Sequence, residues 1–322
     1  MAKRVLFLCL MTAIGLAVIH LTAGIREKRA EGQYPAPGRL IELDGVKIHA
    51  EQFGEGPDLI LLHGASGTTR EFTFSLVEKL SDQYRVTVFD RPGLGWSRQP
   101  EGFGGAWNSA GESPSLQANI LRQAADELGI VNPLILGHSF GGAVALSWAL
   151  DNPDTAGLIL LGAVSHPWPG ELDWTYRINA SPAGGALFVP FLSAFVPSSY
   201  VNGIIDTIFE PQAVPDGYVD HIGPGLTLRR KTIRANARQV NGVRPHVVKM
   251  ADKYPTLKLP IEIVHGDLDT IVPLSVHSIP LAERVDSAVL TVLEGVGHMP
   301  HHADEAATLA AIERAAQRAG LR

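Results

Sequence analysis

The sequence predicts an α/β protein with a mostly parallel central sheet, preceded by a hydrophobic N-terminal helix. Short runs of leucine, isoleucine and valine alternate with stretches of helical periodicity along most of the 322 residues. Apolar runs without polar alternation are typical of strands that helices cover on both faces. Two further observations shape the prediction: the apolar segment Val5–Ile25, and the loss of the strand pattern over residues 166–256.

The N-terminal segment is long enough to cross a membrane. Lys3 and Arg4 precede Val5–Ile25, which as a helix would span about 30 Å, the thickness of the hydrocarbon core of a bilayer. Residues 1–25 are therefore a single-pass transmembrane anchor or a signal peptide, which would leave a secreted or periplasmic protein; a buried helix is a third reading. The length favours the anchor, because Thr22-Ala23-Gly24 is a mediocre cleavage site.

Residues 26–38, REKRAEGQYPAPG, are polar and contain proline and glycine, so we expect a linker there. A hairpin follows, in which RLIEL and VKIHAEQF flank the tight-turn pair Asp44-Gly45. The elements of the alternating pattern then come in chain order: strands at 59–62, 85–89, 134–136 and 158–161, with helices near 71–80, 115–128 and 139–150.

The strand pattern resumes after residue 256. Residues 261–264 and 289–293 read as strands, and a final helix is expected at 306–318. The simplest organisation is a core of residues 39–165 and 257–322, with residues 166–256 inserted as a mainly helical cap. Ligands of such sheets bind beyond the carboxyl ends of the strands. The cap would lie over that edge as a lid.

Charge and cysteine content exclude several classes of function. The formal net charge of −6 includes no long block of like charge, so nucleic acid is not an expected partner. Cys9 is the one cysteine, which excludes an intrachain disulfide and a thiol-ligated metal site. No feature of the sequence bears on the oligomeric state.

The candidate nucleophile is Ser139, in the stretch LILGHSFGGAVALSWAL. Gly137-His-Ser139-Phe-Gly141 has the G-x-S-x-G form, with an apolar strand before it and a helical pattern after it. A sharp strand-to-helix turn forces unusual backbone angles on the serine, and glycines two positions away leave room for it. The alternative is a tight turn with a capping serine.

A serine hydroxyl needs a base, and the base needs a carboxylate that orients it. The segment LEGVGHMPHHAD follows the last strand, and we expect His298 to be the base, with His301 and His302 as solvated or capping residues. The segment IVHGDLDTIVP offers two acids. Asp269 is preferred because it lies further over the sheet edge, and Asp267 is expected to bond local backbone as a turn residue.

An oxyanion hole completes the candidate site. The glycine-rich turn LLHGASG after the first buried strand can direct the backbone N–H of Ala65 toward a carbonyl oxygen. The second donor would be the backbone N–H of Phe140, the residue after the nucleophile.

Together these segments resemble the α/β-hydrolase superfamily over residues 39–318. HGASG, DRPGLGWS, GHSFGG, GDLDTIVP and GHMP occur in the order of that family. The resemblance implies the nucleophile, acid and base Ser139, Asp269 and His298, with oxyanion donors Ala65 and Phe140. Other residues of these motifs are expected to be structural: His63, Asp90, Arg91 and His138.

Serine at the elbow sets the expected chemistry. Similar haloalkane dehalogenases and epoxide hydrolases carry aspartate there, whereas serine implies an acyl-enzyme and requires no metal or organic cofactor. The aromatic residues of the cap suit a small, fairly apolar ester, although they could instead form the core of the cap. We therefore expect a membrane-tethered serine carboxylic-ester hydrolase. The alternatives are a carbon–carbon bond hydrolase of the meta-cleavage type, a lactonase, a perhydrolase, or a non-catalytic ligand-binding module.

Overall fold

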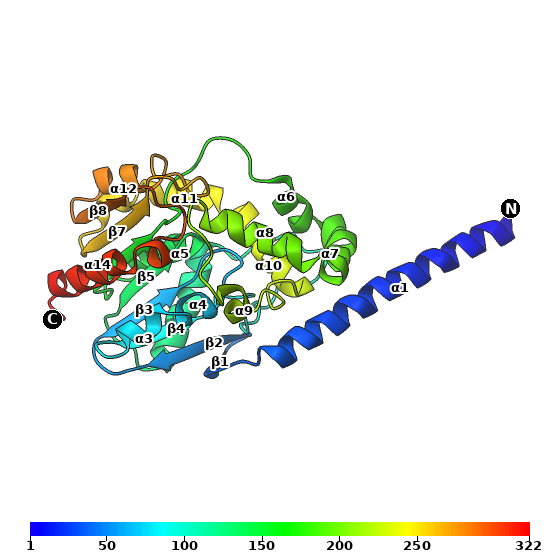
Figure 1. Ribbon diagram of the computed structural model, residues 1–322, viewed down its shortest axis with the longest axis horizontal. Coiled ribbons are helices and arrows are strands. Elements are labelled where there is room, and N and C mark those ends of the chain that lie inside the picture. The colour runs from blue at the N-terminus through cyan, green and yellow to red at the C-terminus, as the bar shows by residue number, and fades with distance from the viewer.

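The computed structural model describes residues 1–322 and contains one eight-stranded sheet, in the order β1-β2-β4-β3-β5-β6-β7-β8 (Figure 1). Strand β2 is antiparallel to β1 and β4, and all other neighbours are parallel. The strands are β1 (Arg39–Leu43), β2 (Val46–Phe53), β3 (Asp58–Leu62), β4 (Arg85–Phe89), β5 (Leu134–His138), β6 (Gly157–Leu161), β7 (Ile261–Gly266) and β8 (Ala288–Leu293).

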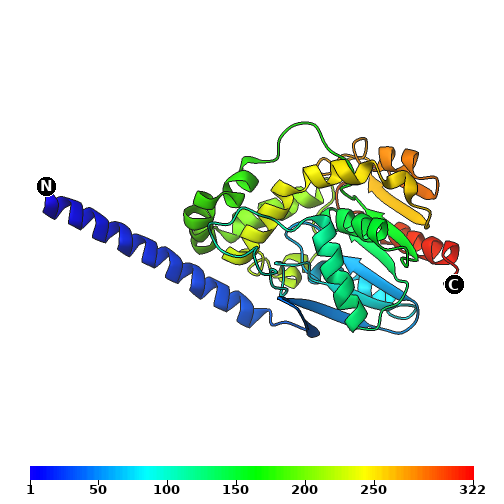
Figure 2. The ribbon, with the colours of Figure 1, turned by 180° about the vertical axis from the view of Figure 1, so that it is seen from behind.

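The central strands β3, β5 and β6 have buried side chains on both faces, as their unbroken apolar runs predict. One core lies between the sheet and helices α4 (Pro114–Glu127) and α5 (Phe140–Asp151), which Figure 2 shows across the rear face. A second core lies on the other face, under α2 (Arg70–Thr73), α3 (Leu76–Leu80) and α14 (Glu305–Arg318). The fold is thus a mostly parallel sheet between two helical layers.

Helix boundaries follow local capping chemistry. The Ser113 side chain accepts the Leu116 N–H at the start of α4, where Pro114 occupies the first helical position. The Asp304 side chain caps α14 by accepting the Ala307 N–H. The single helix expected at 71–80 is instead divided into α2 and α3.

The chain between β6 and β7 contains only helical elements. They are α6 (Trp174–Ala180), the π-helical turn η1 (Gly184–Phe188), α7 (Val189–Phe195), α8 (Ser198–Phe209), α9 (Tyr218–Ile222), α10 (Arg230–Gly242), α11 (Arg244–Ala251) and the 3-10 turn η2 (Tyr254–Thr256). Beyond β7 lie α12 (Ser278–Arg284), α13 (Pro300–Ala303) and α14. We refer to residues 166–256 as the cap.

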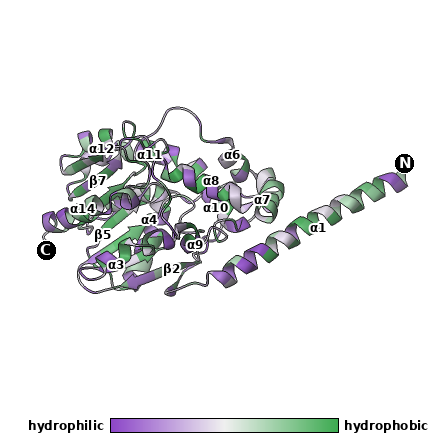
Figure 3. Ribbon diagram, in the orientation of Figure 1, coloured by the Kyte–Doolittle hydropathy of each residue, from purple (hydrophilic) through white to green (hydrophobic).

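Helix α1 (Ala2–Gln33) projects from the rest of the molecule (Figures 1 and 2) and is long and apolar enough to cross a membrane. Figure 3 shows its hydrophobic stretch giving way to hydrophilic residues toward the sheet. The linker expected at residues 26–38 is wrong for residues 26–33, which continue the helix. Contacts with the cap explain this: Glu27 pairs with Arg230 at 2.7 Å, and Glu31 pairs with Arg229 at 3.1 Å.

Strand register brings distant segments to one edge of the sheet. Leu62 at the end of β3 lies opposite Phe89 and Gly137, and His138 at the end of β5 lies opposite Leu161. The loops that leave these strands therefore emerge side by side, at the edge where parallel α/β sheets hold their ligands.

Candidate active site

Ser139 lies in the turn between β5 and α5, in a strained conformation. Its backbone angles are φ 52° and ψ −119°, a region that residues with a side chain rarely adopt. The glycines on either side are required by space. A Cβ on Gly137 would lie 2.5 Å from the Gly141 carbonyl oxygen, and one on Gly141 would collide with the Leu62 carbonyl oxygen. The turn thus holds the Ser139 side chain at the carboxyl edge of the sheet.

The structure brings Ser139, His298 and Asp269 together in one hydrogen-bonded chain. The Ser139 hydroxyl lies 3.0 Å from His298 Nε2, and His298 Nδ1 lies 2.7 Å from Asp269 Oδ2. The carboxylate can only accept, so Nδ1–H donates to Asp269, which leaves Nε2 free to accept from the serine. His298 comes from the loop after β8 and Asp269 from the loop after β7, and all three side chains are buried.

Asp269, not Asp267, faces the histidine. Its Oδ1 accepts the N–H groups of Ile271 and Val272, and its Oδ2 also lies 3.2 Å from His265 Nε2. Burial alone would raise the pKa of Asp269, but the hydrogen bonds from the two histidines hold it far below the usual range. Asp267 is exposed and accepts the Gly295 N–H at 2.7 Å, the turn contact expected for it.

Burial also sets the charge of the base. Desolvation lowers the pKa of His298 below its ordinary value of 6.5, although the hydrogen bond to Asp269 acts in the opposite direction. The imidazole is therefore neutral at pH 7, the form that can accept a proton from a hydroxyl.

The loop after β3 lies directly against the nucleophile. A Cβ on Gly64 would be 3.0 Å from the Ser139 Cβ, so any larger residue would crowd the nucleophile. Ala65 follows, and its backbone N–H makes no hydrogen bond within the protein. Phe140 opens α5, where the first N–H groups of a helix lack intrahelical acceptors. The two predicted oxyanion donors are thus at the ends of segments that meet at Ser139.

Arg91 binds the backbone of the loop after β3. Its guanidinium donates to the carbonyl oxygens of His63 and Gly64 at 2.9 and 2.8 Å, and it lies 4.5 Å from the centre of the Phe140 ring. Its neighbour Asp90 accepts the Thr69 and Trp96 N–H groups and contacts His49. Both residues are fully buried and are bonded only to the surrounding scaffold, which matches the structural roles expected for them.

The cap also contributes to the oxyanion loop. The Asn236 side chain on α10 accepts the Ser66 N–H at 2.7 Å, and the Thr227 hydroxyl donates to the Ser66 carbonyl at 3.0 Å. Ser66 has a positive φ of 60°. No sequence motif indicates these contacts, because they join positions 170 and 161 residues apart.

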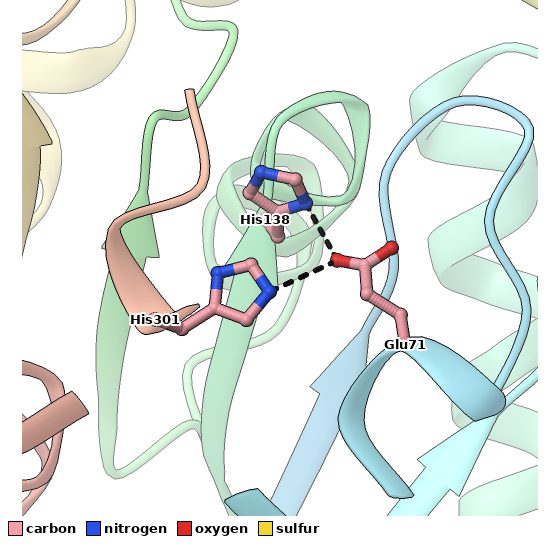
Figure 4. Close-up of side chains that lie close together, drawn as sticks. All are labelled: Glu71, His138 and His301. Atoms are coloured by element: carbon pink, nitrogen blue, oxygen red, sulfur yellow. Dashed lines mark ion pairs between the residues drawn. The ribbon is translucent and has the colours of Figure 1, made fainter. Parts of the chain in front are cut away.

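A buried cluster of Glu71, His138 and His301 lies beside the nucleophile (Figure 4). Glu71 Oε1 is 2.6 Å from His138 Nδ1 and 3.6 Å from His301 Nε2. The expectation that His301 is solvated is wrong: it is 1% exposed, and its ring packs at an angle against those of Phe72 and His138. His302 is also enclosed, by Phe74, Phe209 and Tyr218.

These three residues are the one group whose ligand atoms are close enough to share a metal ion. Two ligands of a tetrahedral zinc lie about 3.3 Å apart. The 2.6 Å between Glu71 Oε1 and His138 Nδ1 is shorter and is the separation of a close ion pair. The arrangement therefore fits an ion pair better than a metal centre.

Fold and site together define an enzyme of the hydrolase class. Residues 59–312 match the Alpha/beta hydrolase family, and the chain belongs to that family.

Individual proteins of known structure or activity are similar to this chain at low sequence identity. The pimeloyl-[acyl-carrier protein] methyl ester esterase of Aeromonas hydrophila is 29% identical over 265 residues, covering 79% of this chain and 93% of its own. An esterase from Exiguobacterium antarcticum has a similar fold, with a TM-score of 0.66, 21% identity, and coverage of 86% of this chain and 98% of the other. A membrane phospholipase A described as a bacterial virulence factor has a TM-score of 0.67 and 18% identity. The match covers 98% of this chain and 99% of the other.

Proposed function

We propose that this protein is a serine hydrolase that cleaves a carboxylic ester of a small, fairly apolar substrate through an acyl-enzyme. The observation that carries the proposal is the chain of hydrogen bonds from Ser139 through His298 to Asp269, set on a strained turn at the sheet edge. The methyl ester esterase and the esterase among the similar proteins support an ester as substrate.

In the first half of the reaction Ser139 Oγ attacks the ester carbonyl while His298 Nε2 takes its proton. Asp269 stabilises the imidazolium and keeps the ring in the required tautomer. The backbone N–H groups of Ala65 and Phe140 then bind the oxyanion of the tetrahedral intermediate, each contributing roughly 3 kcal/mol of transition-state stabilisation. Collapse of the intermediate breaks the ester bond, and His298 gives its proton to the departing alcohol.

In the second half a water molecule takes the place of the alcohol. His298 accepts a proton from the water as it attacks the acyl carbon, and the same donors bind the second oxyanion. Release of the acid restores the Ser139 hydroxyl. Besides the ester and the water, each step uses only side chains and backbone groups of this chain.

We also propose that α1 anchors the enzyme in a membrane and is not removed. Ala23, in the segment where a signal peptidase would cut, is fully buried against the cap. The Arg26 guanidinium donates to the carbonyl oxygens of Ala194 and Val196 at the end of α7. These contacts link the apolar stretch rigidly to the cap, and the likeness to a membrane phospholipase A over nearly the whole chain is compatible with an anchor.

The test is active-site labelling combined with replacement of the nucleophile. Wild-type protein should bind a fluorophosphonate covalently at Ser139 and hydrolyse p-nitrophenyl butyrate. Ser139→Ala should lose the label, and its kcat should fall by on the order of 10⁵- to 10⁶-fold, to the background rate. Hydrolysis by Ser139→Ala at the wild-type rate would contradict the proposal. Faster turnover of lactones or vinylogous diketones than of any ester would replace the substrate class but retain the nucleophile.

A further inference from the structure

Helix α7 presents an apolar stripe to solvent beside the proposed membrane anchor. Leu187, Phe191 and Phe195 recur every fourth residue, so they lie on one side of the helical segment. All three are exposed, Phe191 by 49%, and the rings of Phe191 and Phe195 lie 5.2 Å apart. Trp174 on α6 is exposed as well, and its ring is 6.3 Å from that of Phe188. We call Trp174, Leu187, Phe191 and Phe195 the outer cap face.

The outer cap face is not required by the packing of the cap. The other side of α7 supplies the buried residues Val189, Ser193 and Ala194. The segment Gly184–Phe195 contains no charged residue. An exposed run of large apolar side chains without charges is typical of a surface that contacts a partner or a membrane.

The position of α7 along α1 indicates which partner this is. Arg26 is the first residue after the apolar stretch, and it bonds to the carbonyl oxygens at the end of α7. Ala23, within the last turn of that stretch, is buried by the same contact. If α1 spans the bilayer, α7 is therefore held at the level where the span leaves the hydrocarbon, where aromatic residues are enriched in membrane proteins.

We propose that the outer cap face lies in the boundary between lipid headgroups and acyl chains, on the surface of the bilayer that α1 crosses. The inference rests on the anchor part of the proposed function. Helices α6 and η1–α7 meet at 90°, so they cannot cross the bilayer as one straight helix and instead suit the interfacial plane. Lys28 and Arg29, exposed just beyond the span, suit the headgroup layer.

Lipid quenching of site-specific fluorophores in the full-length protein tests this. Cys9 is exposed within the apolar stretch and can be labelled directly. In a Cys9→Ser background the label is placed at Phe191→Cys, and in the control at Val131→Cys, which is 75% exposed and precedes β5 at the opposite edge of the sheet. Each protein is reconstituted in phosphatidylcholine vesicles containing lipids with a nitroxide near the headgroup.

We expect the label at 191 to be quenched at least threefold more strongly than the label at 131. Quenching at Cys9 with equal quenching at 191 and 131 would overturn the inference and leave the anchor intact. No quenching at Cys9 would overturn both. Crosslinking of two copies through position 191 without lipid quenching would assign the face to a dimer and overturn the inference. Hydrolysis of p-nitrophenyl butyrate by the same samples reports separately on the ester hydrolase.

A second inference concerns Glu71, which contacts two of the segments that form the candidate site and reaches the third through His138. Its Oε1 lies 2.6 Å from His138 Nδ1, next to the nucleophile, and its Oε2 accepts the N–H of Gly64 at 3.4 Å, next to Ala65. His138 Nε2 in turn lies 3.0 Å from the carbonyl oxygen of His298. One buried carboxylate thus connects the loops of the oxyanion hole, the nucleophile and the base.

The contacts of His138 favour a charge on both it and Glu71. Its Nδ1 forms an ion pair with the Glu71 carboxylate and its Nε2 faces the His298 carbonyl oxygen, so a proton on each ring nitrogen is favoured. Burial opposes this charge, but Glu71 raises the pKa of His138 above its ordinary value, and His138 lowers that of Glu71. A neutral residue at position 71 would remove this ion pair and with it the partner that favours a proton on His138 Nδ1.

We infer that Glu71 is a positioning residue for the proposed hydrolysis: through His138 it fixes the backbone of His298 relative to Ser139. It does not itself reach the reacting atoms. Losing the link would loosen the base loop against the nucleophile, and displacements near 1 Å in such a site cost about 100-fold in rate.

Glu71→Gln, compared with Glu262→Gln, tests this role. Glu262 is also a fully buried glutamate in ion pairs, with Arg314 and Arg318, but it contacts none of the three loops. We expect Glu71→Gln to lose roughly 10- to 100-fold in kcat on p-nitrophenyl butyrate with KM changed less than about threefold. Glu262→Gln should lower the melting temperature and retain kcat.

If Glu71→Gln folds only in part, the fluorophosphonate labelling rate constant of its folded fraction gives the same comparison, because it does not depend on yield. A labelling rate and kcat within twofold of wild type would overturn the inference. An equal loss of kcat in Glu262→Gln would also overturn it, since the effect would then be general destabilisation. Complete loss of labelling at Ser139 in the wild type would instead contradict the proposed function.

Discussion

At Ser139 the backbone carries the strain that places the side chain at the carboxyl edge of the sheet. Positive φ with ψ near −119° is unfavourable for serine and costs on the order of 1–3 kcal/mol, and the buried strand and helix on either side hold it in place. The glycines of the motif could be predicted from the sequence because their role is local. The strain itself then marks a site at which geometry is maintained at the expense of stability.

The protonation of His298 predicts how the activity depends on pH. The imidazole must be neutral to accept the serine proton, so kcat/KM should rise with pH as His298 loses its proton. Because burial lowers the pKa of His298, the midpoint of this rise should lie below 6.5. The measurement is kcat/KM on p-nitrophenyl butyrate from pH 4.5 to 8.5, with melting temperatures at each pH as the control. A midpoint above 7 would contradict the assignment of the lowered pKa.

Replacing each candidate acid by asparagine separates their roles. Asp269→Asn removes the acceptor that fixes the tautomer of His298, and kcat should fall by roughly 10³- to 10⁴-fold. Asp267→Asn changes an exposed turn that contacts Gly295, so kcat should change by less than about threefold. The two substitutions make the same chemical change in the same loop. A larger loss at position 267 would reverse the assignment.

At the scale of elements, the second half of α1 is where sequence pattern and structure differ most. The composition of residues 26–38 is that of a linker, yet Ala2–Gln33 is one helix. Its polar residues are satisfied by the cap, with Glu27 bonded to Arg230 and Glu31 to Arg229. Local composition could not predict this, because the partners lie about 200 residues away and their positions depend on the folded cap.

This packing predicts a change in protease sensitivity. Burial opposes ionisation of Glu27, but the hydrogen bonds from Arg230 outweigh it and hold the pKa of Glu27 below its usual value. Glu27→Ala should free the end of α1, so trypsin should cut at Lys28 or Arg29 several-fold faster than in wild type. Glu127→Ala, an exposed glutamate on α4, is the control and should leave the cutting rate unchanged. Equal rates in all three proteins would show that the pair does not hold α1 on the cap.

Across the whole molecule, the features that the sequence predicts are those encoded by a repeated pattern of apolar residues. Alternating apolar runs predict the parallel sheet, and the order of the strands places Ser139, Asp269 and His298 at one edge because each follows a strand end. The contacts of Glu71 and Asn236 could not be predicted in this way. Each is a single polar residue in a helix with no motif, and its significance arises only from the residues that folding brings beside it.

The packing of α1 against the cap leads to a last prediction, that the mature protein keeps residues 1–23. A signal peptidase needs an extended segment with small residues at the third and first positions before the cut. Here those positions would be Leu21 and Ala23, and Ala23 is buried within a helix that continues to Gln33. Intact-mass analysis of the membrane fraction should therefore show the full-length chain.

Leu21→Ala sharpens this measurement, because it supplies the small residue that the cleavage site lacks. If the helix and its contact with the cap protect the segment, this variant should also remain uncut, and it should stay in the membrane after alkaline carbonate extraction. A wild-type chain that begins at Gly24 would contradict the prediction. Cleavage of Leu21→Ala alone would show that Leu21, and not the packing of Ala23 and Arg26 against α7, preserves the anchor.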